Sequence, residues 1–246
     1  MQVIDINCDM GEGTGNDAAL MPYISSANIA CGYHAGDIAT MNDVVKLAIA
    51  HNVSIGAHVS FPDKENFGRR EMQLTLNEVY KLIQDQLQLM IQVAKDHHAM
   101  VKHIKPHGAL YNMSARDPSL ANVIAQAVAD VDPSLVLMGL SGSYSVSEAV
   151  GLGLTTAAEV FADRRYEEDG SLRSRSLPGA MLEDADEALR QVLQMIMQQT
   201  VTAYSGKQIP VAADTVCIHG DGMHAVAFAT RIYHALKNES VVIKAF

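Results

Sequence analysis

The chain has 246 residues, a formal net charge of −10, 48% hydrophobic residues and only 19% charged residues. This composition excludes a disordered chain and a coiled coil, and the length fits a single domain, residues 1–246, with a sizeable core. The negative charge argues against nucleic acid as a partner, because an acidic surface repels phosphate groups.

Targeting and redox features favour a cytoplasmic protein. No apolar run reaches the ~18 residues that a membrane helix requires, so no membrane partner is expected. The first residues lack the basic and apolar regions of a signal peptide. The three cysteines, Cys8, Cys31 and Cys217, form no C-x-x-C pair, which suits a reducing compartment.

Short β-branched segments alternate with amphipathic ones along the chain, which is typical of βαβ units. The predicted strands are residues 3–8, 27–31, 54–58, 101–105, 135–140, 155–160 and 215–219. Helix starts are predicted at Thr40, at Thr75 with Glu78 as a capping box, at Asp117 before Pro118, and at Asp184. A last helix follows the seventh strand, with an apolar face from Ala225 to Leu236.

Seven parallel strands can form a TIM-like barrel or an open doubly wound sheet. The first turn reads G-E-G-T-G-N at residues 11–16 and lacks the third glycine of the dinucleotide fingerprint, and no G-x-x-x-x-G-K-[ST] occurs. We therefore predict an α/β fold, an irregular seven-stranded parallel β/α barrel. We also expect that the chain does not bind ATP strongly by itself.

Polar and ionisable residues gather just after the predicted strands, at the end where such barrels hold their active sites. Any one of them can be a cap or a buried structural residue, but independent structural roles would not confine the whole set to one end of the strands. The candidate catalytic residues are Asp9, Glu12, His34, Asp37, His58, Lys105, His107, Glu159, His219 and Asp221.

This set suits proton transfer and anion stabilisation at a carbonyl, with a histidine or carboxylate as base and Lys105 or backbone N–H groups facing the oxyanion. A divalent metal on Asp9, His34 and His58 is a second interpretation, although no H-x-x-x-H pair marks it. The cysteines are expected to be small buried hydrophobes.

Arginines concentrate in two polar segments, one at residues 69–70 and one at 163–178. We predict that the second segment folds over the barrel mouth, with Gly170 and Gly179 as hinges, and that Arg164 meets a carboxylate or phosphoryl oxygen. The alternative is a solvated loop that only touches a partner. The candidate substrate-binding residues are Asn7, Arg69, Asp163 and Arg164.

Six strand-end segments are long enough to compare with known families. They read D-I-N-C-D-M-G-E-G at 5–13, S-A-N-I-A-C-G-Y-H-A-G-D at 26–37, G-A-H at 56–58, K-P-H-G-A-L-Y-N at 105–112, E-V-F-A-D-R at 159–164 and T-V-C-I-H-G-D at 215–221. In order and along the whole chain, they resemble the LamB/YcsF family.

The resemblance implies a barrel of the glycoside hydrolase/deacetylase type. It also implies a cytoplasmic subunit that works with subunits B and C to open the lactam of 5-oxoproline to glutamate, with ATP as co-substrate of the complex. Two other functions stay open. One is a stand-alone metal-dependent amide hydrolase such as a carbohydrate deacetylase, and the other is a non-catalytic ligand-binding subunit.

Overall fold

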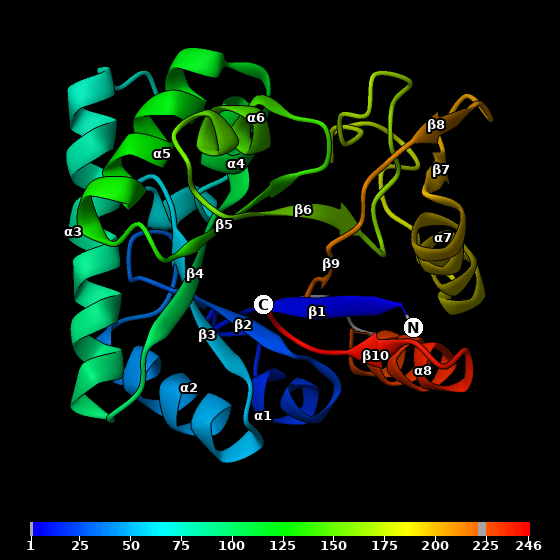
Figure 1. The fold of residues 1–246 in the computed structure, drawn as a ribbon, viewed down its shortest axis with the longest axis horizontal. Coiled ribbons are helices and arrows are strands. Elements are labelled where there is room, and N and C mark those ends of the chain that lie inside the picture. The colour runs from blue at the N-terminus through cyan, green and yellow to red at the C-terminus, as the bar shows by residue number, and fades with distance from the viewer. Residues whose placement is uncertain (1, 221–224) are drawn as a thin grey trace.

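The computed structural model describes residues 2–220 and 225–246. Within them, seven parallel strands close into a barrel, in the order β1-β2-β3-β4-β5-β6-β9 and back to β1 (Figure 1). The strands are β1 (Val3–Met10), β2 (Ser26–Ala30), β3 (Ser54–Val59), β4 (Val101–Pro106), β5 (Val136–Leu140), β6 (Thr156–Phe161) and β9 (Thr215–Ile218). The predicted seven-stranded barrel is confirmed.

The barrel is irregular at two places. The register between β3 and β4 shifts at Ile55 and Gly56. Strands β4 and β5 share only the pairs His103–Val136 and Ile104–Leu137. A short strand β10 (Val242–Ile243) also pairs with the start of β1, outside the closed ring.

The barrel interior is polar, whereas its outer layer is apolar. In β1, Ile4, Ile6 and Cys8 belong to the hydrophobic core and are at most 1% exposed. Because side chains alternate along a strand, Asp5, Asn7 and Asp9 point the other way, where they bond to side chains of neighbouring strands. The interior therefore holds a hydrogen-bonded network instead of the branched aliphatic layers common in β/α barrels.

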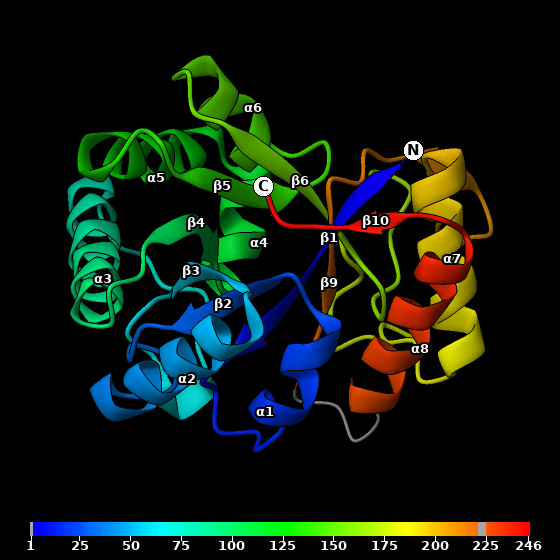
Figure 2. The same cartoon turned by 60° about the horizontal axis from the view of Figure 1, so that its bottom comes forward.

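Helices cover the outside of this barrel (Figures 1 and 2). Helices α2, α3 and α5 lie beside strands β2 to β5, and α7 packs on α8 at the opposite side. The helices are α1 (Asp17–Leu20), α2 (Ile38–His51), α3 (Leu76–Asp96), α4 (Gly108–Arg116), α5 (Pro118–Val131), α6 (Tyr144–Gly151), α7 (Ala185–Gln198) and α8 (Ala225–Asn238). Among the described residues, none of these helices is both long and apolar enough to cross a membrane.

Most of the predicted helix starts are confirmed. Thr75 and Glu78 form the expected capping box of α3, and Asp117 and Asp184 cap α5 and α7. The start of α2 is a correction: its cap is Asp37, whose carboxylate accepts from the backbone N–H of Thr40 at 2.8 Å. Thr40 therefore lies inside the first turn.

The structure adds elements that the sequence pattern did not predict. Helices α4 and α6 and a hairpin of β7 (Thr200–Thr202) with β8 (Gln208–Pro210) are new. The arginine-rich segment after β6 is held by isolated bridges from Arg164 to Met181 and from Tyr166 to Leu172. Tyr166 is fully buried, so the segment has a fixed path at its base.

Candidate active site

A cavity of about 890 Å³ opens at the carboxyl ends of the strands. Many of the predicted site residues line it, together with residues of the segment after β6. The predicted residues in its wall are Asp9, Glu12, His58, Lys105, His107, Arg69, Arg164 and His219. Polar residues that follow the predicted strands therefore lie in the wall of this cavity.

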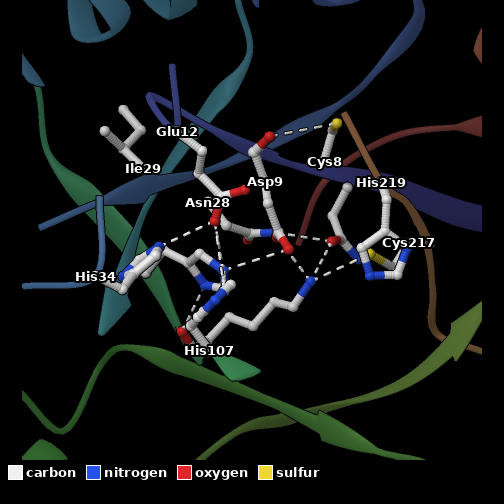
Figure 3. A network of polar contacts seen from close by, with 12 residues as sticks. Cys8, Asp9, Glu12, Asn28, Ile29, His34, His107, Cys217 and His219 are labelled. Atoms are coloured by element: carbon white, nitrogen blue, oxygen red, sulfur yellow. Dashed lines mark hydrogen bonds and ion pairs between the residues drawn. The ribbon is translucent and has the colours of Figure 1, made fainter. Parts of the chain in front are cut away.

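Lys105, in the wall of this cavity, is the centre of a polar network that includes Asp9 and Cys217, both labelled in Figure 3. Its Nζ is 2.8 Å from Asp9 Oδ1 and 2.9 Å from Glu159 Oε1. It also lies 3.2 Å from both Asn7 Oδ1 and Cys217 Sγ. Burial by itself lowers the pKa of Lys105, but the two carboxylates and the cysteine outweigh burial and raise it well above its ordinary value. Lys105 is therefore a fixed positive charge.

Asn28 and His103, which the sequence analysis missed, complete this network. Asn28 Nδ2 donates to Asp9 Oδ1 at 2.8 Å, and Asn28 Oδ1 accepts from His103 Nε2 at 2.8 Å. The alternation of strand residues could have identified both, since His103 shares a face with Lys105 in β4 and Asn28 lies mid-strand in β2. A Cβ on Gly56 would lie 2.0 Å from His103 Nε2, so only glycine leaves room for this ring.

A second cluster joins Glu12 to three histidines. Glu12 Oε1 lies 2.9 Å from His34 Nε2, 3.4 Å from His107 Nδ1 and 3.7 Å from His58 Nε2. The rings of His34 and His107 stack with centroids 3.9 Å apart, and the ring of His58 meets both edge-on. Figure 3 shows Glu12, just after β1, pointing toward His34 and His107.

Backbone carbonyl groups fix the orientation of two of these rings. Nδ1 of His58 donates to the carbonyl oxygen of Lys105, and Nε2 of His107 donates to that of Phe67, each at 2.9 Å. This leaves Nε2 of His58 and Nδ1 of His107 facing each other at 2.8 Å. Two nitrogen lone pairs at this distance repel, so the pair requires a shared proton or a cation.

Burial favours the neutral form of the imidazoles of His34, His103 and His107. Burial, with the nearby His58, lowers the pKa of His34 to about 3 and that of His107 well below its usual range. Burial also lowers the pKa of His103 to about 3. Neutral imidazoles can accept a proton or bind a metal.

Two glycines allow the backbone to close over the histidines. Gly68 and Gly108 both have positive φ, at 63° and 53°. A Cβ on Gly68 would lie 2.9 Å from Cβ of His34 and 3.0 Å from the ring of His107. Residues 67–69 therefore pack directly against the histidine cluster. The carbonyl oxygen of Gly68 accepts a hydrogen bond from the backbone N–H of Ala109.

Asp163 and His219 form a pair at the opposite side of the mouth. His219 Nδ1 lies 2.8 and 2.9 Å from the two carboxylate oxygens of Asp163, and the ring stacks on Phe161. Burial raises the pKa of Asp163, but His219, Arg175 and Arg164 outweigh it, so the net shift is downward. The carboxylate is therefore held ionised and orients the imidazole.

The segment after β6 uses its four arginines differently. Arg165 pairs with Glu187, and Arg173 pairs with Glu167 and stacks over Tyr204. Arg164 is only 5% exposed and donates to the carbonyl oxygen of Arg173, yet its Nε has no hydrogen-bond partner among the described residues. Arg175 lies near Arg164, and this second cation, after burial, lowers the pKa of Arg164 to about 10. Both line the cavity, where they offer positive charge to an anion.

Some predicted site residues lie elsewhere. Asp37 caps α2 and does not line the cavity, because its carboxylate is committed to the first turn of the helix. Asn7 and Glu159 are fully buried in the barrel interior, below the cavity wall. Arg69 stacks over Phe67 at the rim. Asp221 is outside the described residues.

The metal ligands predicted from the sequence are only partly brought together. Asp9 is held by Lys105 and Asn28, although its Oδ2 approaches His58 Nε2 at 3.3 Å. The described donor atoms that converge within 4.8 Å of one another belong instead to Glu12, His34, His58 and His107. The donor atoms of Asp9, Cys217 and His219 also lie within 4.8 Å of one another, but Asp9 and Cys217 already contact the ammonium of Lys105.

The fold and the site together define a seven-stranded β/α barrel with acid–base groups at the carboxyl ends of its strands. The chain belongs to the LamB/YcsF family, which it matches over residues 4–246.

Known proteins are similar over the whole chain. A protein of Staphylococcus aureus (strain Newman), named as the A subunit of 5-oxoprolinase, is 50% identical over 246 residues, 98% of each chain. The crystal structure of the lactam utilization protein from Thermus thermophilus superposes with a TM-score of 0.92 at 40% identity, covering both chains completely. A family 4 carbohydrate esterase from Streptomyces lividans, with a TM-score of 0.52 and 11% identity over 98% and 91% of the two chains, shares the fold.

Proposed function

We propose that the chain is the A subunit of an ATP-dependent 5-oxoprolinase and works with subunits B and C in the cytoplasm, as one barrel domain. The observation that carries the proposal is the 50% identity, over 98% of both chains, to a protein of that name. The relative is named as one subunit of an enzyme, which supports the proposal that this chain works with partner chains. The cavity lined by acid–base groups supports a catalytic role rather than a scaffold.

The chemistry of a lactam explains why ATP is required. A five-membered lactam is an unreactive amide whose ring closure is favoured by proximity of its ends. Transfer of the γ-phosphoryl group of ATP to the lactam oxygen forms a P–O bond and releases ADP, which makes the ring carbon electrophilic. Water then adds to that carbon, the ring C–N bond breaks and the nitrogen takes a proton, which leaves an acyl phosphate. A second water hydrolyses the acyl phosphate and releases phosphate and glutamate.

The described residues of the cavity offer groups for each step. Glu12 is placed to take a proton from water, and His219, oriented by Asp163, is placed to give one to the leaving nitrogen. Lys105 supplies a fixed positive charge below the reacting carbonyl. Arg164 and Arg175 are the candidate clamp for the carboxylate of 5-oxoproline or for the transferred phosphoryl group. Without a P-loop or a dinucleotide fingerprint in the sequence, the ATP site is assigned to subunits B and C.

The competing function is a metal-dependent deacetylase, which the shared fold and the glutamate–histidine cluster favour. Mixing the purified chain with its B and C subunits and measuring glutamate release from 5-oxoproline separates the two. The proposal requires glutamate formation that depends on ATP and on all three chains. Acetate release from an N-acetylated sugar by the chain alone, without ATP, would support the deacetylase instead.

A further inference from the structure

We propose that Glu12, His34, His58 and His107 form a binding site for one divalent transition-metal ion, with Zn²⁺ as the natural occupant by donor chemistry. This inference rests on the proposed function only for the substrate on which the ion would act. The binding of the ion is inferred from the geometry of the four side chains. Three imidazole nitrogens and one carboxylate oxygen are a donor set that Zn²⁺ prefers in proteins.

The donor separations fit one small ion. Metal–nitrogen and metal–oxygen bonds of about 2.0–2.1 Å in a tetrahedral site place the donor atoms roughly 3.3 Å apart. Four of the six donor pairs are His58–His107 at 2.8 Å, Glu12–His34 at 2.9 Å, Glu12–His107 at 3.4 Å and Glu12–His58 at 3.7 Å, and all six lie within 4.8 Å. These distances bracket that value, and the stacked rings of His34 and His107 must turn for both nitrogens to face one ion.

The surroundings of the rings are those of metal ligands. His58 and His107 each give their outer N–H to a backbone carbonyl, which turns an unprotonated nitrogen inward and fixes the tautomer. Without an ion, a shared proton would join these two nitrogens and His34 Nε2 would donate to Glu12 Oε1 at 2.9 Å. An ion satisfies all four donors at once.

The cluster is enclosed on one side and open on the other. The side chain of His34 is 0% exposed, and that of Glu12 is 6% exposed. Glu12, His58 and His107 nevertheless line the cavity, so a further ligand can reach the ion from there. An ion at this position would polarise a carbonyl or phosphoryl oxygen that enters the cavity.

Local charge distinguishes this cluster from the other set of converging donors. Asp9 and Cys217 lie 2.8 and 3.2 Å from the ammonium of Lys105, which already supplies their positive charge. A second cation there would be repelled by Lys105 at short range. The glutamate–histidine cluster is therefore the metal site of choice among the described residues.

The test measures metal binding by the full chain without substrate. After removal of metals with a chelator, the protein is titrated with Zn²⁺ by calorimetry and with Co²⁺ by visible absorption, which reports the ligand field directly. We expect one equivalent of either ion to bind. Glu12→Gln and His34→Gln should each weaken binding by roughly 100-fold or more, since even loss of a residue that only orients a ligand costs about 10–100-fold.

Two matched variants sharpen the result. His51→Gln removes an exposed histidine, and His219→Gln removes a donor of the competing set; both should bind the ions as the original chain does. Near-ultraviolet circular dichroism checks that each variant is folded. If a variant is not folded, the titration of the unmodified chain alone decides whether the chain binds one ion. Failure of the unmodified chain to bind an equivalent of ion overturns the proposal, as does weakening by His219→Gln but not by Glu12→Gln. Neither result bears on ring opening, which is assayed separately through glutamate release.

Discussion

Nζ of Lys105 lies 2.8 Å from Oδ1 of Asp9, and the two side chains are only 3% and 7% exposed. Glu159, whose side chain is 0% exposed, shares the same ammonium. Two buried carboxylates thus depend on one cation. Removal of one partner from a buried ionic network leaves uncompensated charge, which costs far more than the loss of a surface pair.

Lys105→Met should therefore lower the free energy of unfolding by about 3–5 kcal/mol. Lys102→Met is the matched control, because Lys102 lies on the same strand but is exposed, and it should change stability by no more than about 0.5 kcal/mol. Urea denaturation measures both. Equal stabilities of the two variants would contradict the central place of Lys105.

Gly56→Ala should destabilise the barrel through His103. The added Cβ would meet the imidazole at 2.0 Å and push it from its hydrogen bond to Asn28. Overpacking of this kind costs about 1–3 kcal/mol, or more where the neighbours cannot move. Gly151→Ala is the control, since nothing lies within 4 Å of its added Cβ, and it should leave stability unchanged or slightly raised. A thermal denaturation series in which both variants melt together would refute the steric account.

The stabilising effect of Asp163 should depend on pH. Its pKa is lowered in the folded protein, so the ionised carboxylate stabilises the fold above its ordinary pKa of about 4. This contribution disappears as the pH falls through the lowered folded-state value.

Measurement of the free energy of unfolding between about pH 3 and pH 7 tests whether the folded-state pKa of Asp163 is lowered. The difference between the original chain and Asp163→Asn should be constant above about pH 5 and should shrink below about pH 4. The exposed Asp43→Asn is the control. A difference that grows toward acid pH would mean that the pKa is raised instead.

The three cysteines should resist alkylation in the folded protein. All of them are buried, and burial raises the pKa of Cys31 to about 12 and that of Cys8 and Cys217 well above the ordinary value. The thiolate is the reactive form, so iodoacetamide should modify none of them until a denaturant is added. Mass spectrometry reads the result, and rapid native labelling of Cys217 would show that the barrel interior is accessible.

Arg164→Lys should impair the reconstituted enzyme even though the charge is kept. A guanidinium group binds a carboxylate or phosphoryl group through two parallel N–H donors, which an ammonium cannot provide. We expect a loss of roughly 10–100-fold in kcat/KM, the equivalent of a charged hydrogen bond. The exposed Arg190→Lys serves as the control. Complete rescue of Arg164→Ala by excess B and C subunits would show that the residue only contacts a partner.

The sequence predicts the strands better than it predicts the short helices. Strand segments carry β-branched runs that end in polar residues, and their alternation with capped helices is visible without a structure. Helix α6, in contrast, has only eight residues, and its N-cap Ser143 makes no side-chain capping bond, so no cap or long apolar face marks it. Helix α4 begins directly after His107, in a segment that also carries site residues.

The candidate site was also only partly predictable from the sequence. Parallel strands bring their ends together, so Asp9, His58 and His219 could be placed near one another from the sequence. The pairing of individual groups depends on tertiary distances that no spacing reveals. Two such pairings are the ion pair of Asp9 with Lys105 and the contact of Glu12 with His34, which only the structure reveals.

The central claim is that the barrel mouth of this chain carries out the ring opening. The most direct test is glutamate release from 5-oxoproline and ATP by the reconstituted three-subunit complex containing Asp9→Asn, with Asp43→Asn as the surface control. We predict that Asp9→Asn assembles with its partners but loses at least about 100-fold in kcat, because Asp9 holds Lys105, the positive charge assigned to the reacting carbonyl, whereas Asp43→Asn keeps full turnover. Full turnover by the Asp9→Asn complex would contradict the claim and would make the chain a non-catalytic subunit.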